Sequence, residues 1–132
     1  MNSSRYRSGQ ALVEFALLAT LLITLLLGIF DFGRAYYTQV QIKNAVGDAG
    51  YFAIQNPKNR TATKAAIKRQ LGNLDPALTD SDITITCTSG ETKIKVSYQY
   101  NLMFTWIVPS AHVTLGDETY VPQVDGCPST TF

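Results

Sequence analysis

The chain has 132 residues, a formal net charge of +1 and two cysteines. Its length suits one small domain, and its near-neutral charge argues against a nucleic-acid-binding protein. Much of the apolar content lies between Ala11 and Phe30, which leaves roughly a hundred residues for a water-soluble part.

The N-terminal segment has the composition of a cytoplasmic flank followed by a membrane helix. Residues 1–9 carry Arg5 and Arg7 and no acidic residue, so this end is expected to stay in the cytoplasm. Residues 15–30 contain no charge. A span of about 20 residues is needed to cross a bilayer, and that length is reached only by starting at Ala11 and including Glu14.

Three interpretations of this segment remain open. A secretory signal peptide would be cut after the apolar run, where Gly33 and Ala35 are small residues at suitable offsets. Against it, the helical pattern continues through that point. An uncut membrane anchor is the second interpretation. The third is a leader cut on the cytoplasmic side after Gly9, which leaves the apolar helix on the mature protein.

The residues around this point carry a family resemblance. A short basic leader ending in Gly9, followed by Gln10, Glu14 and Phe15, resembles the class III signal of type IV pilins and pseudopilins. The strings GQALVEFAL and DFGRAYYTQ are similar to those of the TadE-like family, the minor pilins of the tight-adherence (Tad, Flp) pilus machinery. The resemblance covers about residues 8–55. Gln10 departs from the Phe or Met common at the first mature position of other type IV pilins.

The resemblance implies a processing site and a set of partners. A prepilin peptidase would cut between Gly9 and Gln10, which makes Glu14 the fifth mature residue, and Phe15 matches an aromatic position of Flp-type pilins. The other partners implied are pilin and minor pilin subunits, the Tad inner-membrane platform proteins and the lipid bilayer. The protein would lie in the inner (cytoplasmic) membrane with its head in the periplasm or outside, or in an extracellular pilus.

Glu14 is costly in hydrocarbon, by about 2.5–3.5 kcal/mol on insertion scales. In a pilin-like assembly, such a Glu is thought to pair with the free N-terminal amine of a neighbouring subunit, and cleavage after Gly9 would create that amine. Paired charges offset part of the cost of burial and select a register. The alternative is a carboxylate that reaches to the membrane interface.

A second feature of the apolar helix is a repeat of small residues. Ala16, Thr20, Thr24 and Gly28 recur every fourth residue, a pattern that lets membrane helices approach closely. We interpret this small-residue stripe as a packing face against a subunit or membrane partner. Because small residues are common in membrane helices, a chance occurrence remains the alternative.

The expected fold is α+β, with three parts along the chain: a leader over 1–9, one long helix over 10–55 and a head over 56–132. Residues 11–31 of the helix would cross the membrane. Beyond it, one apolar stripe is expected to pack on the head. The stripe consists of Ala35, Ile42, Ala45, Val46, Ala49 and Phe52. Tyr36 and Tyr37 either lie in an interfacial aromatic belt or pack into the head.

The head is expected to contain a short helix and an antiparallel sheet of three or four strands. The turn signal NPKNR precedes a helix over 62–71, and residues 75–82 are expected to form a loop. Alternation of period two predicts strands over 82–87 and 93–100, joined as a hairpin at 88–91. A third strand is expected over 112–115 or 119–121, with Gly116 and Asp117 as a turn or bulge. The apolar stretch over 102–110 either lies under the sheet or forms an exposed patch.

The two cysteines, Cys87 and Cys127, allow one intramolecular pairing. Because the membrane interpretation exports this region, a disulfide is expected. It would close a loop of about 40 residues and stabilise the head by roughly 4 kcal/mol in the chain-entropy model. Two unrelated buried thiols are the alternative.

The sequence contains no pattern of residues typical of catalysis or cofactor binding, so we expect no enzyme activity, cofactor or catalytic residue. No metal site is expected either, because Asp75, Asp80 and Asp82 lack EF-hand spacing and are interpreted as turn and cap residues. The predicted function is a minor pilin or pseudopilin that takes part in Tad pilus assembly by helix packing. The alternative is an unprocessed single-span membrane protein whose head binds a component of a secretion or adhesion complex.

Overall fold

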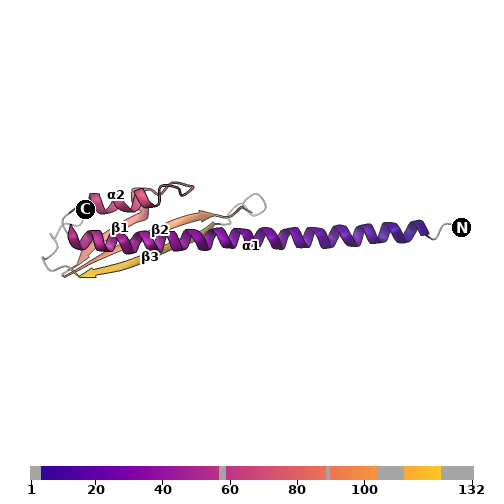
Figure 1. Cartoon of the computed structure of the whole chain (residues 1–132), viewed down its shortest axis with the longest axis horizontal. Helices are drawn as coiled ribbons and strands as arrows, with labels where there is room; N and C mark the ends of the chain where they lie inside the picture. The colour runs from indigo at the N-terminus through magenta and orange to yellow at the C-terminus, as the bar shows by residue number, and fades with distance from the viewer. Residues whose placement is uncertain (1–3, 57–58, 89, 104–111, 123–132) are drawn as a thin grey trace. The chain divides into compact units, whose positions relative to one another are not determined.

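A computed structural model describes residues 4–56, 59–88, 90–103 and 112–122. The chain divides into two compact units, residues 1–34 and 35–132. Helix α1, Ser4–Gln55, the long helix of Figure 1, includes residues of both units. The predicted long helix is therefore confirmed, and it begins before the expected first residue.

In the first unit, the uncharged run of α1 over residues 15–30 has apolar side chains on every face. Between Gly9 and Phe30 every side chain is exposed except that of Ala19, which is half-buried. The described residues contain one helix that is long and apolar enough to cross a membrane, Gly9–Gln55. A helix that is hydrophobic all round needs an apolar surrounding, so this surface is suited to lipid or to other helices.

In the second unit, α1 contributes one face to the core. Ile42, Ala45, Val46 and Ala49 are buried, as the predicted stripe requires, and Ala35 packs at the edge of the core. Phe52 is only half-buried, and Ala53 is buried at this end of the helix instead. The remaining core residues come from the second helix and the sheet, and they are Ile67, Leu71, Ile83, Ile94, Val96, Tyr98, Tyr100 and Val121.

Helix α2, Arg60–Gln70, is the predicted short helix, and it begins two residues earlier than expected. It begins there because the side chain of Asn59 accepts a hydrogen bond from the backbone N–H of Ala62 at 3.0 Å, which is an N-cap. Its Ile67 is fully buried. The Gln70 side chain donates to Asp48 of α1 at 2.9 Å, which joins the two helices in the second unit.

The segment predicted as a loop contains one turn of 3-10 helix, η1, Asp80–Asp82. The Asp82 carboxylate accepts from the Thr79 N–H at 2.7 Å and from its hydroxyl at 2.6 Å, and this capping box gives the segment its helical turn. Asp80 pairs with Lys68 of α2 at 2.7 Å, and this ion pair lowers the pKa of Asp80. Asp82 thus has the cap role expected of it, whereas the ion pair of Asp80 with Lys68 was not predicted.

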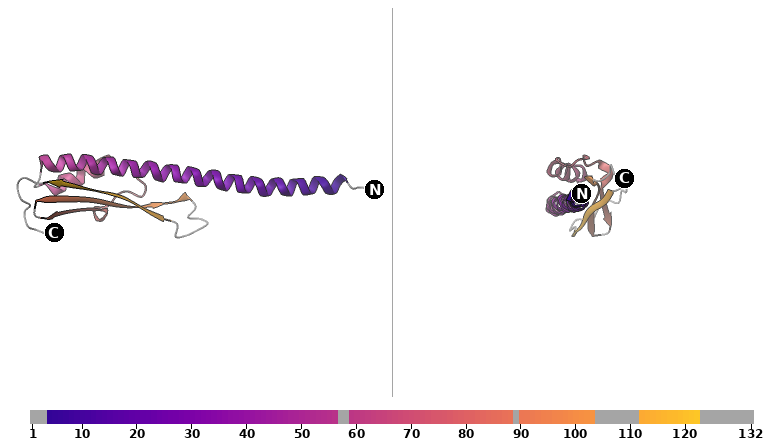
Figure 2. Two further views of the ribbon diagram at one scale, coloured as in Figure 1. Left: turned by 90° about the horizontal axis from the view of Figure 1, so that it is seen from below. Right: turned by 90° about the vertical axis from the view of Figure 1, so that its right-hand side faces the viewer.

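The sheet contains three antiparallel strands in the order β1-β2-β3: Ile83–Thr88, Glu91–Asn101 and His112–Pro122. Burial alternates along β2, with the buried residues facing the helices. Gly90 has φ +95° in the β1–β2 turn, a conformation that glycine adopts without steric cost. Helix α2 and the α1 segment of this unit lie on one face of the sheet (Figure 2), so the predicted α+β fold is confirmed.

The prediction for the third strand was wrong in one respect. β3 is continuous and pairs with β2 residue for residue from Glu91↔Pro122 to Asn101↔His112, so Gly116 and Asp117 form neither a turn nor a bulge. Gly116 lies opposite Ser97, where a Cβ would meet the carbonyl oxygen of Val96. Glycine is needed here for a close approach between two strands.

A side chain of α1 binds the backbone of β3 at the same glycine. The Gln39 amide donates to the Gly116 carbonyl at 2.8 Å and accepts from the Gly116 N–H at 3.1 Å. Further along, a Cβ at Gly50 of α1 would lie 3.3 Å from the side chains of Thr119 and Val121. Gly116 and Gly50 therefore permit two close contacts of β3, one with β2 and one with α1.

Tyr98 joins the sheet to the loop before η1. Its side chain is buried, and its hydroxyl donates to the Pro76 carbonyl at 3.0 Å. Burial raises the pKa of Tyr98 above its ordinary value of 10.0, because the phenolate would lose its hydration.

We predict that Gly116→Ala destabilises the head by about 1–3 kcal/mol, the range for an overpacked site. The matched control is Gly47→Ala, because nothing lies within 4 Å of a Cβ at Gly47 and alanine is the better helix former by up to about 1 kcal/mol. Urea unfolding of the full chain in detergent, followed by near-ultraviolet circular dichroism, measures both. Equal stability of the two variants would contradict this role of Gly116.

We predict that the head loses stability in alkali, because the buried Tyr98 must then ionise. Because its pKa is raised in the folded state, its contribution is complete below pH of about 10 and is lost as the pH rises through the folded-state pKa. Tyr98→Phe should lower stability at neutral pH by about 0.5–1.5 kcal/mol through loss of the hydrogen bond. It should also flatten the alkaline decline, which urea midpoints measured between pH 8 and 11 test; an unchanged slope would contradict the assignment.

Candidate functional site

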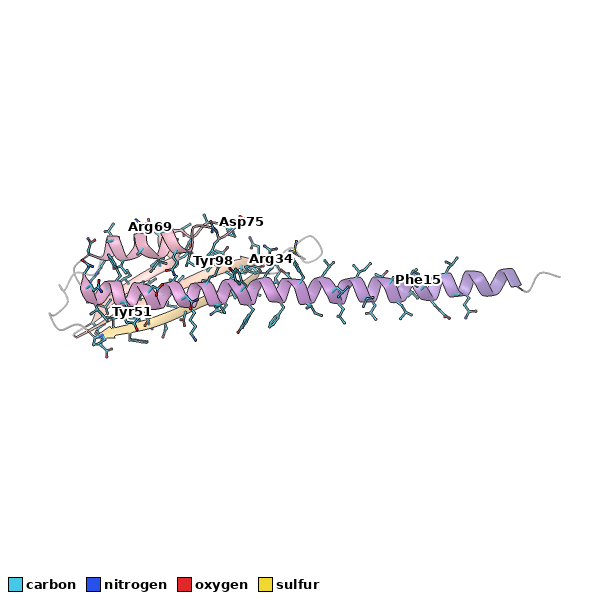
Figure 3. All side chains as sticks on the ribbon, in the orientation of Figure 1. Phe15, Arg34, Tyr51, Arg69, Asp75 and Tyr98 are labelled. Atoms are coloured by element: carbon cyan, nitrogen blue, oxygen red, sulfur yellow. The ribbon has the colours of Figure 1, made fainter. Side chains whose placement is uncertain are left out.

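The predicted processing and assembly residues lie together at the start of the first unit. Gly9, Gln10 and Glu14 are exposed on α1. The Gln10 side-chain amide donates to the Glu14 carboxylate at 3.3 Å, a contact between residues four apart on one helix face. Phe15 is 70% exposed and projects from the helix (Figure 3). The assignment of these residues to cleavage and assembly remains a prediction.

The small-residue stripe is exposed along α1 at Ala16, Thr20, Thr24 and Gly28. Each threonine hydroxyl donates to the carbonyl four residues earlier: Thr20 to Ala16 and Thr24 to Thr20, both at 2.8 Å. Because the hydroxyl hydrogens are used within the helix, the stripe presents small, nearly apolar surface. Nothing lies within 4 Å of a Cβ at Gly28, so a neighbouring helix could approach there.

The segment after the uncharged run combines a buried acid with exposed aromatic rings. Asp31 is only 2% exposed, although sequence analysis assigned it no role. Tyr36 and Tyr37 are 63% and 65% exposed, so neither is packed into the head. Their exposure fits the interfacial interpretation of these residues better than the packing interpretation.

The outer face of the sheet contains a small charged cluster that sequence analysis missed. Lys93 and Glu118 form an ion pair at 2.8 Å. The Tyr120 hydroxyl donates to Glu118 at 3.0 Å, and the Lys93 ammonium lies 5.0 Å from the Tyr120 ring centroid. Glu118, followed by Tyr120, raises the pKa of Lys93, while Lys93 lowers the pKa of Glu118. Cross-strand pairing places Lys93 opposite Tyr120. This pairing was not predicted, because the third strand was expected to be interrupted at Gly116 and Asp117.

The described parts of the head were also searched for a cavity and for a metal site. A shallow hollow of about 330 Å³ on β2 and β3 is lined by Lys95, Val96, Ser97, Thr114, Gly116, Asp117 and Glu118. Among the described residues, no group of three or more His, Cys, Asp or Glu side chains could hold a metal ion. Of the apolar stretch over 102–110, Leu102 packs against the edge of the core and Met103 is 51% exposed. The rest of the stretch lies outside the described residues, so neither of its two interpretations is tested.

The sulfur of Cys87 lies 3.2 Å from the Thr92 hydroxyl. Cys87 is half-buried, on the face of β1 that also carries buried Ile83. Cys127, the other cysteine of the sequence, lies outside the described residues. Pairing of Cys87 with Cys127 therefore stays a prediction.

Comparison with known proteins gives a match over the helix that carries these residues. Residues 9–50 match the family model described as TadE-like protein. This match confirms the predicted family resemblance over nearly the segment expected, and it covers less than half of the 132 residues. No curated protein and no solved structure matches the chain.

The exposed small-residue stripe generates a prediction about helix association. Gly28→Leu adds a bulky side chain to it and should weaken self-association or partner binding by about 1–3 kcal/mol, the cost of overpacking a contact. Leu22→Phe adds bulk away from the stripe and is the control. Chemical cross-linking of the full chain in detergent measures both. An unchanged cross-linked fraction for Gly28→Leu would exclude the stripe as a packing face.

Proposed function

We propose that this chain is a minor pilin or pseudopilin of a Tad-type pilus, held in the inner membrane by α1 and assembled by helix packing. The observation that carries the proposal is one exposed, apolar helix whose residues 9–50 match the TadE-like family. Leu12, Leu17, Leu21 and Ile23 are each more than half exposed. Such a surface is stable in lipid or against other helices, not in water.

The leader is proposed to be removed on the cytoplasmic side by prepilin peptidase, between Gly9 and Gln10. Both residues are exposed at the start of α1. The positive residues of the leader would stay in the cytoplasm, so the second unit would lie in the periplasm or outside. The remaining partners are other pilin subunits, the platform proteins of the inner membrane and the bilayer.

Glu14 is proposed to pair with the N-terminal amine of a neighbouring subunit. Within its own helix, the neutral amide of Gln10 is the group bonded to it, at 3.3 Å. A neutral amide satisfies one oxygen of the carboxylate but does not compensate its charge. An amine from a second subunit would do so, and burial of the pair in the membrane would then favour one register between helices.

The head is proposed to act through binding, on a sheet that the predicted disulfide would stabilise. A disulfide between Cys87 and Cys127 would stabilise a small exported domain. Tyr120 is 55% exposed, and its cluster with Lys93 and Glu118, together with the hollow on β2 and β3, suits weak polar contacts with neighbouring components. No step of the proposed assembly mechanism requires catalysis or a cofactor.

The first experiment determines the mature N-terminus. The chain is expressed with and without prepilin peptidase, extracted from the membrane and measured by intact mass. We expect a mature chain that starts at residue 10 only when the peptidase is present. A chain beginning at Met1 in both strains would overturn the processing proposal and favour the unprocessed single-span protein whose head binds a secretion or adhesion component.

The second experiment tests the charge of Glu14. Glu14→Gln keeps the shape and removes the charge, so it should leave cleavage intact but reduce assembly at least about tenfold, since breaking a buried ion pair costs about 3–5 kcal/mol. Leu18→Val is the control in the same exposed segment. Sheared pilus yield and co-purification of subunits measure assembly. Normal assembly of Glu14→Gln would remove the ion-pair role.

A further inference from the structure

We propose that one end of the head binds the surface of the lipid bilayer, so that the sheet as well as α1 contacts lipid. The inference rests on the proposed membrane insertion of α1, and it goes beyond that insertion by assigning a second lipid-binding surface, on the head itself. This surface is the end of the second unit at which the chain enters it, at Ala35, and we call it the entry end. The described residues that give it exposed apolar surface are Tyr36, Tyr37, Met103 and Val113.

The contacts between α1 and β3 determine which end of the sheet belongs to the entry end. Gln39, close to the start of the unit, binds the backbone of Gly116 at 2.8 and 3.1 Å. Gly50 is close to the end of α1, and a Cβ there would lie 3.3 Å from the side chain of Val121. β3 therefore runs along α1 in the same direction (Figure 1). Because β2 and β3 are antiparallel, β2 ends and β3 begins at the entry end.

The ends of these strands extend as far as the first residues of the unit. Val113 precedes Gly116 by three residues, which is about 10 Å along a strand. Ala35 precedes Gln39 by four residues, which is about 6 Å along a helix. Val113, and the end of β2 that pairs with it, therefore reach at least the level of Ala35.

The described residues of the entry end carry no charge, apart from the imidazole of His112. Residues 35–42, 98–103 and 112–116 contain no Asp, Glu, Lys or Arg. The charged residues of β2 and β3 lie further from this end, and they are Glu91, Lys93, Lys95, Asp117 and Glu118. A surface in water usually mixes charged residues of both signs, whereas the membrane interface favours aromatic side chains. The distribution of charge over the head therefore favours lipid as the neighbour of this end.

The exposed side chains of α1 at this end agree with the depth of the lipid headgroups. The uncharged run ends at Phe30, and Tyr36 follows it by six residues, about 9 Å along a helix. The headgroup region extends roughly 5–8 Å beyond the hydrocarbon on each side, and side chains on a helix lean toward its N-terminus. The rings of Tyr36 and Tyr37 therefore reach the headgroups. Met103 and Val113, which are 51% and 42% exposed, add apolar surface at the same end of the unit.

The first experiment measures whether the methyl group of Met103 contacts lipid. The full chain is placed in nanodiscs of phosphatidylcholine and phosphatidylglycerol, with its methionine methyl groups labelled for NMR. Met1 is the other methionine, and Met103→Leu identifies the signal of Met103. Signal loss is recorded with a lipid that carries a nitroxide near the top of its acyl chain, and separately with a water-soluble gadolinium chelate. The control is Ile54→Met, because Ile54 is 54% exposed and lies near the other end of the α1 segment.

We expect the Met103 signal to be lost with the nitroxide lipid and retained with the gadolinium chelate, and the signal from Ile54→Met to do the opposite. Equal loss of both signals with gadolinium would mean that the head stands clear of the bilayer; it would overturn the inference and leave the insertion of α1 intact. A Met103 signal shielded from both probes would mean that protein covers it, such as a second copy, and would also overturn the inference. A chain that does not enter the nanodiscs would overturn the proposed membrane function, and this inference with it.

A charge at the entry end should release the head from the bilayer. Val113→Glu places a carboxylate where lipid is expected, and one charge at an anionic surface changes the bound population by about fivefold. Tyr37→Glu repeats the test outside the sheet, and Ile54→Glu is the matched control. Loss of the Met103 signal with the nitroxide lipid is the measurement, and near-ultraviolet circular dichroism identifies the variants that keep a folded head. A nitroxide effect as strong in both entry-end variants as in Ile54→Glu would overturn the lipid contact.

Discussion

The structure depends on one helix whose side chains must suit two different surroundings. A helix satisfies its backbone hydrogen bonds internally, so it can pass from lipid to water without leaving peptide groups unpaired. The side chains then determine where each part belongs. From Phe15 to Phe30 they carry no charge and apolar side chains lie on every face, and from Ala35 onward only one face is buried against the sheet. One element thus serves as both the membrane segment and the base of the head.

Much of this arrangement could be predicted because it follows from periodicity. The helical stripe through Ile42, Val46 and Ala49 and the alternation along β2 each reflect the burial of one face, and both are found in the structure. The third strand could not be predicted correctly, because glycine beside aspartate is typical of a turn. Gly116 lies within a strand for a tertiary reason, namely its close approach to Val96 and its contact with Gln39. The residues next to Gly116 in the sequence do not indicate either of these contacts.

The candidate site shows the same limit. Gly9, Glu14 and the small-residue stripe could be selected from charge, spacing and resemblance. The contact between Gln10 and Glu14 could have been found from their separation of four residues on a helix. The internal hydrogen bonds of Thr20 and Thr24 and the cluster of Lys93, Glu118 and Tyr120 require backbone geometry and strand register. The burial of Asp31 likewise could not be predicted from the sequence, because nothing in the residues around it indicates a buried carboxylate.

The Gln39–Gly116 contact also affects how copies of the protein can meet. β3 ends the sheet, and an open sheet edge invites a strand from another molecule, which is a route to aggregation. At Gly116 both backbone groups are already bonded to the Gln39 side-chain amide, so this residue offers no free peptide group to an incoming strand. This contact interrupts the run of open backbone groups along β3, and so it disfavours the addition of a strand at this edge.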